Sequence, residues 1–215
     1  MTHSLHREGS RDSLERDYVL FIYPAIGHND AGSAPKVRRL VELVFLSGPS
    51  NMTTAKLRRN LYSGVTPDDV LNSIKDGTCV FCVFNNREKL KEVLSNIKKA
   101  DQGISIVVSG LIDRVREISA EIGLNPHTIN LSLGIHGRTD RLPPPEVRQF
   151  TTMCGHGVVS PGLVCDVIRK LKIRKITPWE GGLILATPCA CGIQSPHRSE
   201  EMLRETSPLY TVSRW

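Results

Sequence analysis

The feature that most constrains the fold of this chain is an alternation of short apolar runs with longer amphipathic segments between residues 18 and 135. The apolar runs predict strands at residues 18–23, 79–84, 104–109 and 128–135. The amphipathic segments predict helices at residues 35–45, 87–99 and 111–122, with shorter helices at 54–62 and 67–74. Because strands that alternate with helices are typical of βαβ units, we expect an α/β fold with a mainly parallel sheet.

The alternation stops after Gly137, and the character of the chain changes. The run Pro143-Pro144-Pro145 predicts an extended linker, because proline disfavours helix in the residue before it. Beyond the linker, residues 161–172 and 177–186 predict helices that begin at Ser160 and at the capping box of Thr177. We therefore expect a C-terminal helical Cys/His module after the sheet. The predicted organisation is a flexible N-terminal tail (1–16), an α/β sheet domain (17–137), a helical metal-binding module (138–197) and a C-terminal tail (198–215).

The helical module contains a cluster of soft metal ligands. Cys154 and His156 are two residues apart, Cys189 and Cys191 are two residues apart, and glycines flank both pairs. In extended chain, residues two apart point the same way, so each pair can present two ligands to one centre. Three cysteines and one histidine are a common tetrahedral zinc set, and thiolates equally suit an iron–sulfur cluster, for which Cys165 is a further ligand. The spacing predicts a zinc ion or an iron–sulfur cluster and does not distinguish them.

A thiol enzyme without a metal is the alternative interpretation of these cysteines. Residues 153–157 (MCGHG) resemble the first cysteine loop of the proline racemase and diaminopimelate epimerase superfamily. The resemblance implies two thiols that act as opposed proton donor and acceptor. The metal-independent alternative is an isomerase or lyase type of enzyme, with Cys154 as nucleophile or proton-transfer base, polarised by His156. The second loop of that superfamily, Cys-Gly-Thr-Gly, has no match at Cys189-Ala190-Cys191-Gly192, so no family is assigned.

The remaining cysteines and a polar loop supply further candidates. Cys79 and Cys82 lie in an apolar run, which predicts buried side chains, and Cys82 joins a site only where a cavity opens beside it. His136 and Arg138 directly follow the predicted strand 128–135, and ligands of open α/β sheets gather beyond the carboxyl ends of strands. We therefore assign His136 as a candidate acid or base and Arg138 as a candidate anchor for an anionic substrate.

Net charge and hydropathy limit the kinds of partner that the protein is expected to bind. The formal net charge is +6, and the densest basic run is residues 169–175. Aromatic residues, which would stack on bases, are only 5% of the chain and none interrupts this run, which argues against a nucleic-acid partner. No apolar stretch is long enough for a membrane helix or a signal peptide, so we expect a cytoplasmic protein with no membrane partner. The oligomeric state is not predicted.

Three functions agree with these features. The first is a metal-binding protein, zinc or iron–sulfur, that acts as an enzyme on a small polar or anionic substrate through His136 and Arg138. The second is the metal-independent cysteine enzyme. The third is a non-enzymatic binding or regulatory module with a structural metal.

Overall fold

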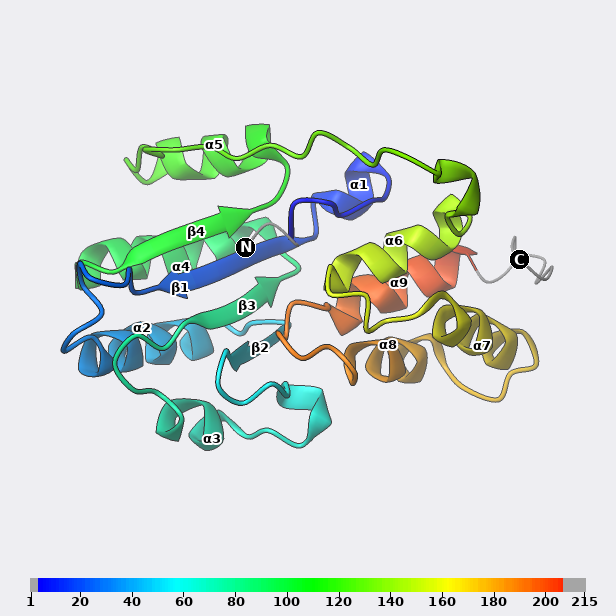
Figure 1. The fold of residues 1–215 in the computed structure, drawn as a ribbon, viewed down its shortest axis with the longest axis horizontal. Helices are drawn as coiled ribbons and strands as arrows, with labels where there is room; N and C mark the ends of the chain where they lie inside the picture. The colour runs from blue at the N-terminus through cyan, green and yellow to red at the C-terminus, as the bar shows by residue number, and fades with distance from the viewer. Residues whose placement is uncertain (1–3, 207–215) are drawn as a thin grey trace.

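The computed structural model describes residues 4–206 and contains a four-stranded sheet. The strands are β1 (Tyr18–Tyr23), β2 (Asn51–Thr54), β3 (Val80–Phe84) and β4 (Ser105–Ser109), in the sheet order β2-β3-β1-β4 (Figure 1). All three neighbouring pairs are antiparallel, with Leu20 opposite both Cys82 of β3 and Val108 of β4. The strands predicted at 18–23, 79–84 and 104–109 are confirmed.

The prediction of a mainly parallel sheet is wrong. Helix α2 (Ala34–Leu46) connects β1 to β2, and α4 (Arg87–Ala100) connects β3 to β4, so both units are βαβ in sequence. Strand β3 lies between β1 and β2, and β1 lies between β3 and β4. Each pair of strands joined by a helix is therefore separated by a strand of opposite direction, which is the split βαβ, or ferredoxin-like, topology. The name refers to the strand order and not to a cofactor.

The first core lies on the face of the sheet that carries Tyr18, Leu20 and Ile22. Successive side chains of a strand point to opposite faces, and β3 contributes Val80, Cys82 and Phe84 to this same face. Buried side chains of α2 and α4 cover it, together with Val70 of α3 (Pro67–Asn72) and Ile118 of α5 (Ile112–Glu121).

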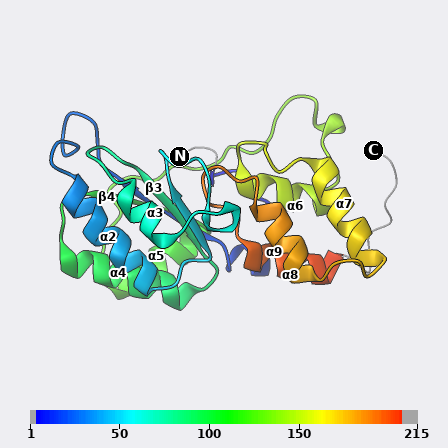
Figure 2. The ribbon, with the colours of Figure 1, turned by 90° about the horizontal axis from the view of Figure 1, so that it is seen from below.

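The second core begins on the opposite face, at Val19, Phe21 and Val83. It continues into four helices: α6 (Pro145–Cys154), α7 (Pro161–Lys172), α8 (Pro178–Ala186) and α9 (Pro196–Thr206). Both ribbon views show these helices as one group at one end of the molecule (Figures 1 and 2). The helical segment therefore shares its core with the sheet.

The predicted helix starts are confirmed where a side chain caps the helix. Thr66, Ser160 and Thr177 accept hydrogen bonds from amides in the first turns of α3, α7 and α8, and a proline follows each of them. The capping box predicted at Thr177 is present, with the Thr177 amide donating to the Glu180 carboxylate at 2.7 Å.

Several predicted elements differ in the structure. Residues 54–62 are not a helix, because β2 ends at Thr54 and only a short 3-10 turn, η2 (Leu61–Ser63), follows. Residues 128–135 are not a strand: they have no partner strand among residues 4–206, and their alternating apolar side chains remain exposed, with Leu133 at 86%. A strand needs a neighbouring ladder as well as an alternating pattern. The predicted linker Pro143-Pro144-Pro145 is not wholly extended, because Pro145 is already the first residue of α6.

The segments predicted as tails contain ordered contacts. Residues 4–16 include the short helix α1 (Arg11–Leu14) and the buried side chain of Arg7, and residues 198–206 belong to α9, where Arg198 is fully buried. Among the described residues, no helix has the length and apolar character that crossing a membrane requires.

Candidate metal centre

The first ligand loop is built by the end of α6. Cys154 is the last residue of this helix and is fully buried, while Gly155 follows in a left-handed conformation with φ 55°. This turn lets the His156 amide donate a hydrogen bond to the carbonyl of Cys154. Gly157 is also left-handed, with φ 72°. The helix end therefore buries the thiol and leaves the His156 side chain at the surface.

The second ligand loop follows α8 and places its two sulfur atoms together. The Cys189 amide donates to the Ala186 carbonyl at 3.1 Å, and the Gly192 amide donates to the Cys189 carbonyl at 3.3 Å. Both thiols are buried, and the two Sγ atoms are 3.6 Å apart. Gly192 allows the loop to lie directly on β2, since a Cβ atom there would be 2.6 Å from the carbonyl carbon of Met52.

The two loops converge on one point. The Sγ atoms of Cys154 and Cys191 and a ring nitrogen of His156 all lie within 4.8 Å of one another. The Cys189 thiol is in hydrogen-bond contact with both Cys154 and Cys191. Three of the four predicted ligands thus form a group that can hold a metal ion, and the fourth sulfur adjoins it.

The electrostatics of the three thiols favour one thiolate and two protonated neighbours in the absence of a cation. Hydrogen bonds from Cys154 and Cys191 hold the pKa of Cys189 well below its usual range, with further contributions from the backbone amides of Gln194 and Ile193. The hydrogen bond to Cys189 raises the pKa of Cys154 to about 11, and hydrogen bonds to Cys154 and Cys189 raise the pKa of Cys191. A bound cation would allow all three to ionise together.

Buried asparagine side chains from β2 and from the start of η2 hold the second loop. Asn60 Nδ2 donates to the carbonyls of Cys189 (2.8 Å) and Ala186 (2.9 Å), and Asn51 Nδ2 donates to the carbonyl of Gln194 (3.0 Å). Both asparagines are completely buried. The sequence analysis missed them, because nothing in the local pattern of a lone asparagine shows which distant carbonyl it binds.

The other predicted site residues lie elsewhere. His136 and Arg138 are exposed; a ring nitrogen of His136 is 2.9 Å from the Leu133 carbonyl, and Arg138 forms two bonds with Asp140 at 2.8 and 3.0 Å. Because residues 128–135 do not form a strand, no sheet edge holds this pair. Cys82 is buried in the first core, Cys165 lies half-buried on α7, and neither belongs to the converging ligands.

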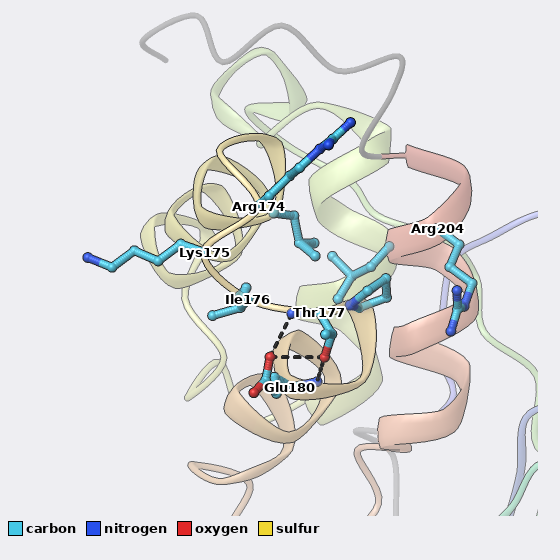
Figure 3. Close-up of a pocket in the computed structure, with 9 residues that line it drawn as sticks. Arg174, Lys175, Ile176, Thr177, Glu180 and Arg204 are labelled. Atoms are coloured by element: carbon cyan, nitrogen blue, oxygen red, sulfur yellow. Dashed lines mark hydrogen bonds between the residues drawn. The ribbon is translucent and has the colours of Figure 1, made fainter.

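No candidate metal ligand lines either of two cavities among the described residues. One, of about 600 Å³, lies between the start of α8 and α9, and Figure 3 shows that the side chains of Arg174, Lys175 and Arg204 around it point away from one another. They do not form a common anion site. The other, of about 430 Å³, lies between residues 5–8 and the segment from Ser132 to Leu142.

Comparisons of the chain with known protein families, with curated proteins and with solved structures found no match.

Proposed function

We propose that this protein binds one divalent transition-metal ion, zinc in the first place, through Cys154, His156, Cys189 and Cys191. The observation that carries the proposal is the convergence of two thiols and an imidazole within 4.8 Å, with the third thiol in contact. The ion would join the end of α6 to the loop after α8 and so close the helical segment on itself.

The spacing of the sulfur atoms favours a single ion over an iron–sulfur cluster. Zinc–sulfur bonds of about 2.3 Å in a tetrahedron place neighbouring sulfur atoms about 3.8 Å apart. The Cys189 and Cys191 Sγ atoms are 3.6 Å apart. A cubane cluster places several iron atoms between its thiolates and would hold them further apart than these side chains lie.

A structural role for the ion has the stronger support. The three sulfur ligands are buried, and the loop that carries two of them is fixed by Asn51, Asn60 and the close approach to β2. Four protein ligands fill a tetrahedral site, as in structural zinc centres. This arrangement supports the non-enzymatic module, with a metal that stabilises the fold.

One observation favours a second candidate, a metal centre open to an external ligand. His156 is the exposed member of the set and lies between two left-handed glycines. An imidazole on such a turn is the ligand that a substrate would most easily replace, after which the ion would act as a Lewis acid. His136 and Arg138 have no part in this candidate, since no strand end brings them to the centre.

Metal analysis tests the proposal. We expect protein purified without chelators to contain about one zinc ion per chain, and Cys189→Ser and Cys191→Ser each to abolish most of it. Cys79→Ala is the matched control, because Cys79 lies directly before β3 and outside the ligand group, and should leave the zinc content unchanged. A folded wild-type protein that binds no divalent metal would refute the proposal.

Cobalt substitution separates the two candidates. A closed site with four protein ligands should give a tetrahedral Co²⁺ spectrum that does not change when azide or cyanide is added. A spectrum that shifts with these anions, and that shifts at lower anion concentration in His156→Ala, where the fourth position is already vacant, would favour the open centre.

A further inference from the structure

A buried charged triad lies beside the candidate metal centre. Asp17 is bound by two guanidinium groups, through Oδ1 to Arg7 Nη1 at 2.5 Å and through Oδ2 to Arg198 Nη1. The side chains of Asp17 and Arg198 are completely buried, and that of Arg7 is only 5% exposed. Arg198 also donates to Ser13 Oγ and to the Glu8 carbonyl, so the triad fixes residues 7–17 against α9.

Arg7 reaches both ligand loops with one nitrogen atom. Its Nη2 donates to the carbonyl of Met153 at 2.9 Å and to the carbonyl of Ile193 at 2.5 Å. Met153 precedes Cys154 at the end of α6, where helix carbonyls lack partners within the helix and attract cations. Ile193 lies two residues after Cys191. A single side chain, distant from both loops in sequence, therefore fixes their separation.

The bond to Ile193 also acts on a sulfur ligand through one peptide group. The Ile193 carbonyl and the Gln194 amide belong to the same peptide, and the Gln194 amide donates to Cys189 Sγ. A guanidinium on the carbonyl polarises this peptide and strengthens its N–H as a donor. Arg7 is thus linked to Cys189 by the series guanidinium, carbonyl, amide and sulfur.

The charge of the triad complements that of a loaded centre. Two guanidinium groups and one carboxylate leave one positive charge in the protein interior. A divalent ion with three thiolates and a neutral imidazole carries one negative charge. Buried charges are costly unless an opposite charge lies close by, so each group stabilises the other.

We propose that Arg7 is a positioning residue of the metal centre, which sets the distance between the two ligand loops and, with Asp17 and Arg198, balances the negative charge of a divalent ion held by three thiolates. This inference rests on the proposed function. It predicts that the metal affinity depends on Arg7, although Arg7 touches no metal ligand side chain.

The test measures the Zn²⁺ dissociation constant by competition with a chromophoric chelator, together with the Co²⁺ spectrum. We expect Arg7→Met to weaken zinc binding by about 10–100-fold, the range typical of residues that orient metal ligands. Arg7→Lys keeps the charge but cannot span both carbonyls and Asp17, so we expect a smaller loss. Arg148→Met is the matched control, since Arg148 binds Glu8 and the Pro143 carbonyl and neither ligand loop.

The outcomes are distinguishable. Weaker zinc binding and an altered Co²⁺ spectrum in Arg7→Met, with Arg148→Met unchanged, support the inference. An Arg7→Met protein that binds zinc as tightly as the wild type overturns it, and where Arg7→Met does not fold, an unchanged affinity in Arg7→Lys does the same. Absence of zinc binding in the wild type would instead refute the proposed function itself.

Discussion

The close contact between Gly192 and β2 predicts that a side chain at position 192 would destabilise the protein. Alanine at position 192 would adopt a left-handed conformation at φ 63°, and its Cβ atom would lie 2.6 Å from the carbonyl carbon of Met52 and 2.9 Å from the Thr53 amide nitrogen. Both neighbours are backbone atoms of a paired strand and cannot move aside alone. Gly192→Ala must therefore either lift the Cys189–Cys191 loop or displace β2.

The magnitude follows from comparison with Gly157, which has a similar φ of 72° but no heavy atom within 4 Å of the position that a Cβ atom would take. A left-handed conformation costs a residue with a Cβ atom about 1–2 kcal/mol, and this cost applies to both variants. Overpacking adds about 1–3 kcal/mol, and only at position 192. Gly192→Ala should therefore lower the free energy of unfolding by about 1–3 kcal/mol more than Gly157→Ala does.

Thermal unfolding with saturating zinc measures this difference. For a chain of this length, 1 kcal/mol corresponds to about 2–4 °C in Tm, so the two variants should differ by about 2–12 °C. Saturating zinc keeps the occupancy of the centre equal in both proteins. An equal loss of Tm in Gly192→Ala and Gly157→Ala would show that the Cys189–Cys191 loop does not pack against β2, and would refute the prediction.

Two further predictions concern the cysteines. Burial raises the pKa of Cys82, so this thiol should resist alkylation in the folded, zinc-loaded protein, whereas the half-buried Cys79 and Cys165 should react. Mass spectrometry after iodoacetamide treatment identifies the labelled cysteines. Rapid labelling of Cys82 would contradict its burial in the first core. The pKa of Cys189 is lowered, whereas the pKa values of Cys154 and Cys191 are raised. Near neutral pH, zinc binding should therefore displace about two protons, and the zinc affinity should increase as the pH rises. Calorimetry in buffers of different ionisation enthalpy measures the proton release, and a zinc affinity that does not depend on pH would contradict the prediction.

Local sequence patterns predicted individual elements better than the sheet they form. Alternating apolar residues and capping side chains are local signals, and they located β1, β3, β4 and the starts of α3, α7 and α8. The order of the strands depends on whether another strand lies between the two that a helix connects. A βαβ connection such as those through α2 and α4 can join two parallel strands that are neighbours in the sheet, or two parallel strands with an antiparallel strand between them. The sequence does not distinguish these arrangements, and the structure shows that β3 lies between β1 and β2.

The candidate site shows the same limit. The spacing of Cys154, His156, Cys189 and Cys191 predicted a group of ligands, and the structure brings Cys154, His156 and Cys191 together, with Cys189 in contact. The residues that hold the loops come from far away: Arg7 lies 146 residues from Met153 and 186 residues from Ile193. A contact between residues so far apart in the sequence produces no local pattern of residues that could predict it. Arg7 also lies in a polar segment whose composition is typical of a flexible tail.

The origin of these supporting residues bears on what the ion would do. All four candidate ligands belong to the helical segment, whereas Arg7, Asn51 and Asn60, which fix the ligand loops, lie outside it. The sheet also shares its second core with the helices, so the fold has support that does not depend on a metal. A small zinc finger lacks such support and unfolds without its ion.

We therefore expect an apo protein that remains folded with its ligand loops close to their bound positions. In such a centre little binding energy is lost to ordering the loops, and the metal contributes stability by mass action. At free zinc about 1,000-fold above the dissociation constant this contribution is about 4 kcal/mol. Chelation should then lower the Tm by about 8–16 °C without abolishing the cooperative transition, because protein contacts join the sheet to the helices and the ion ties together only α6 and the loop after α8.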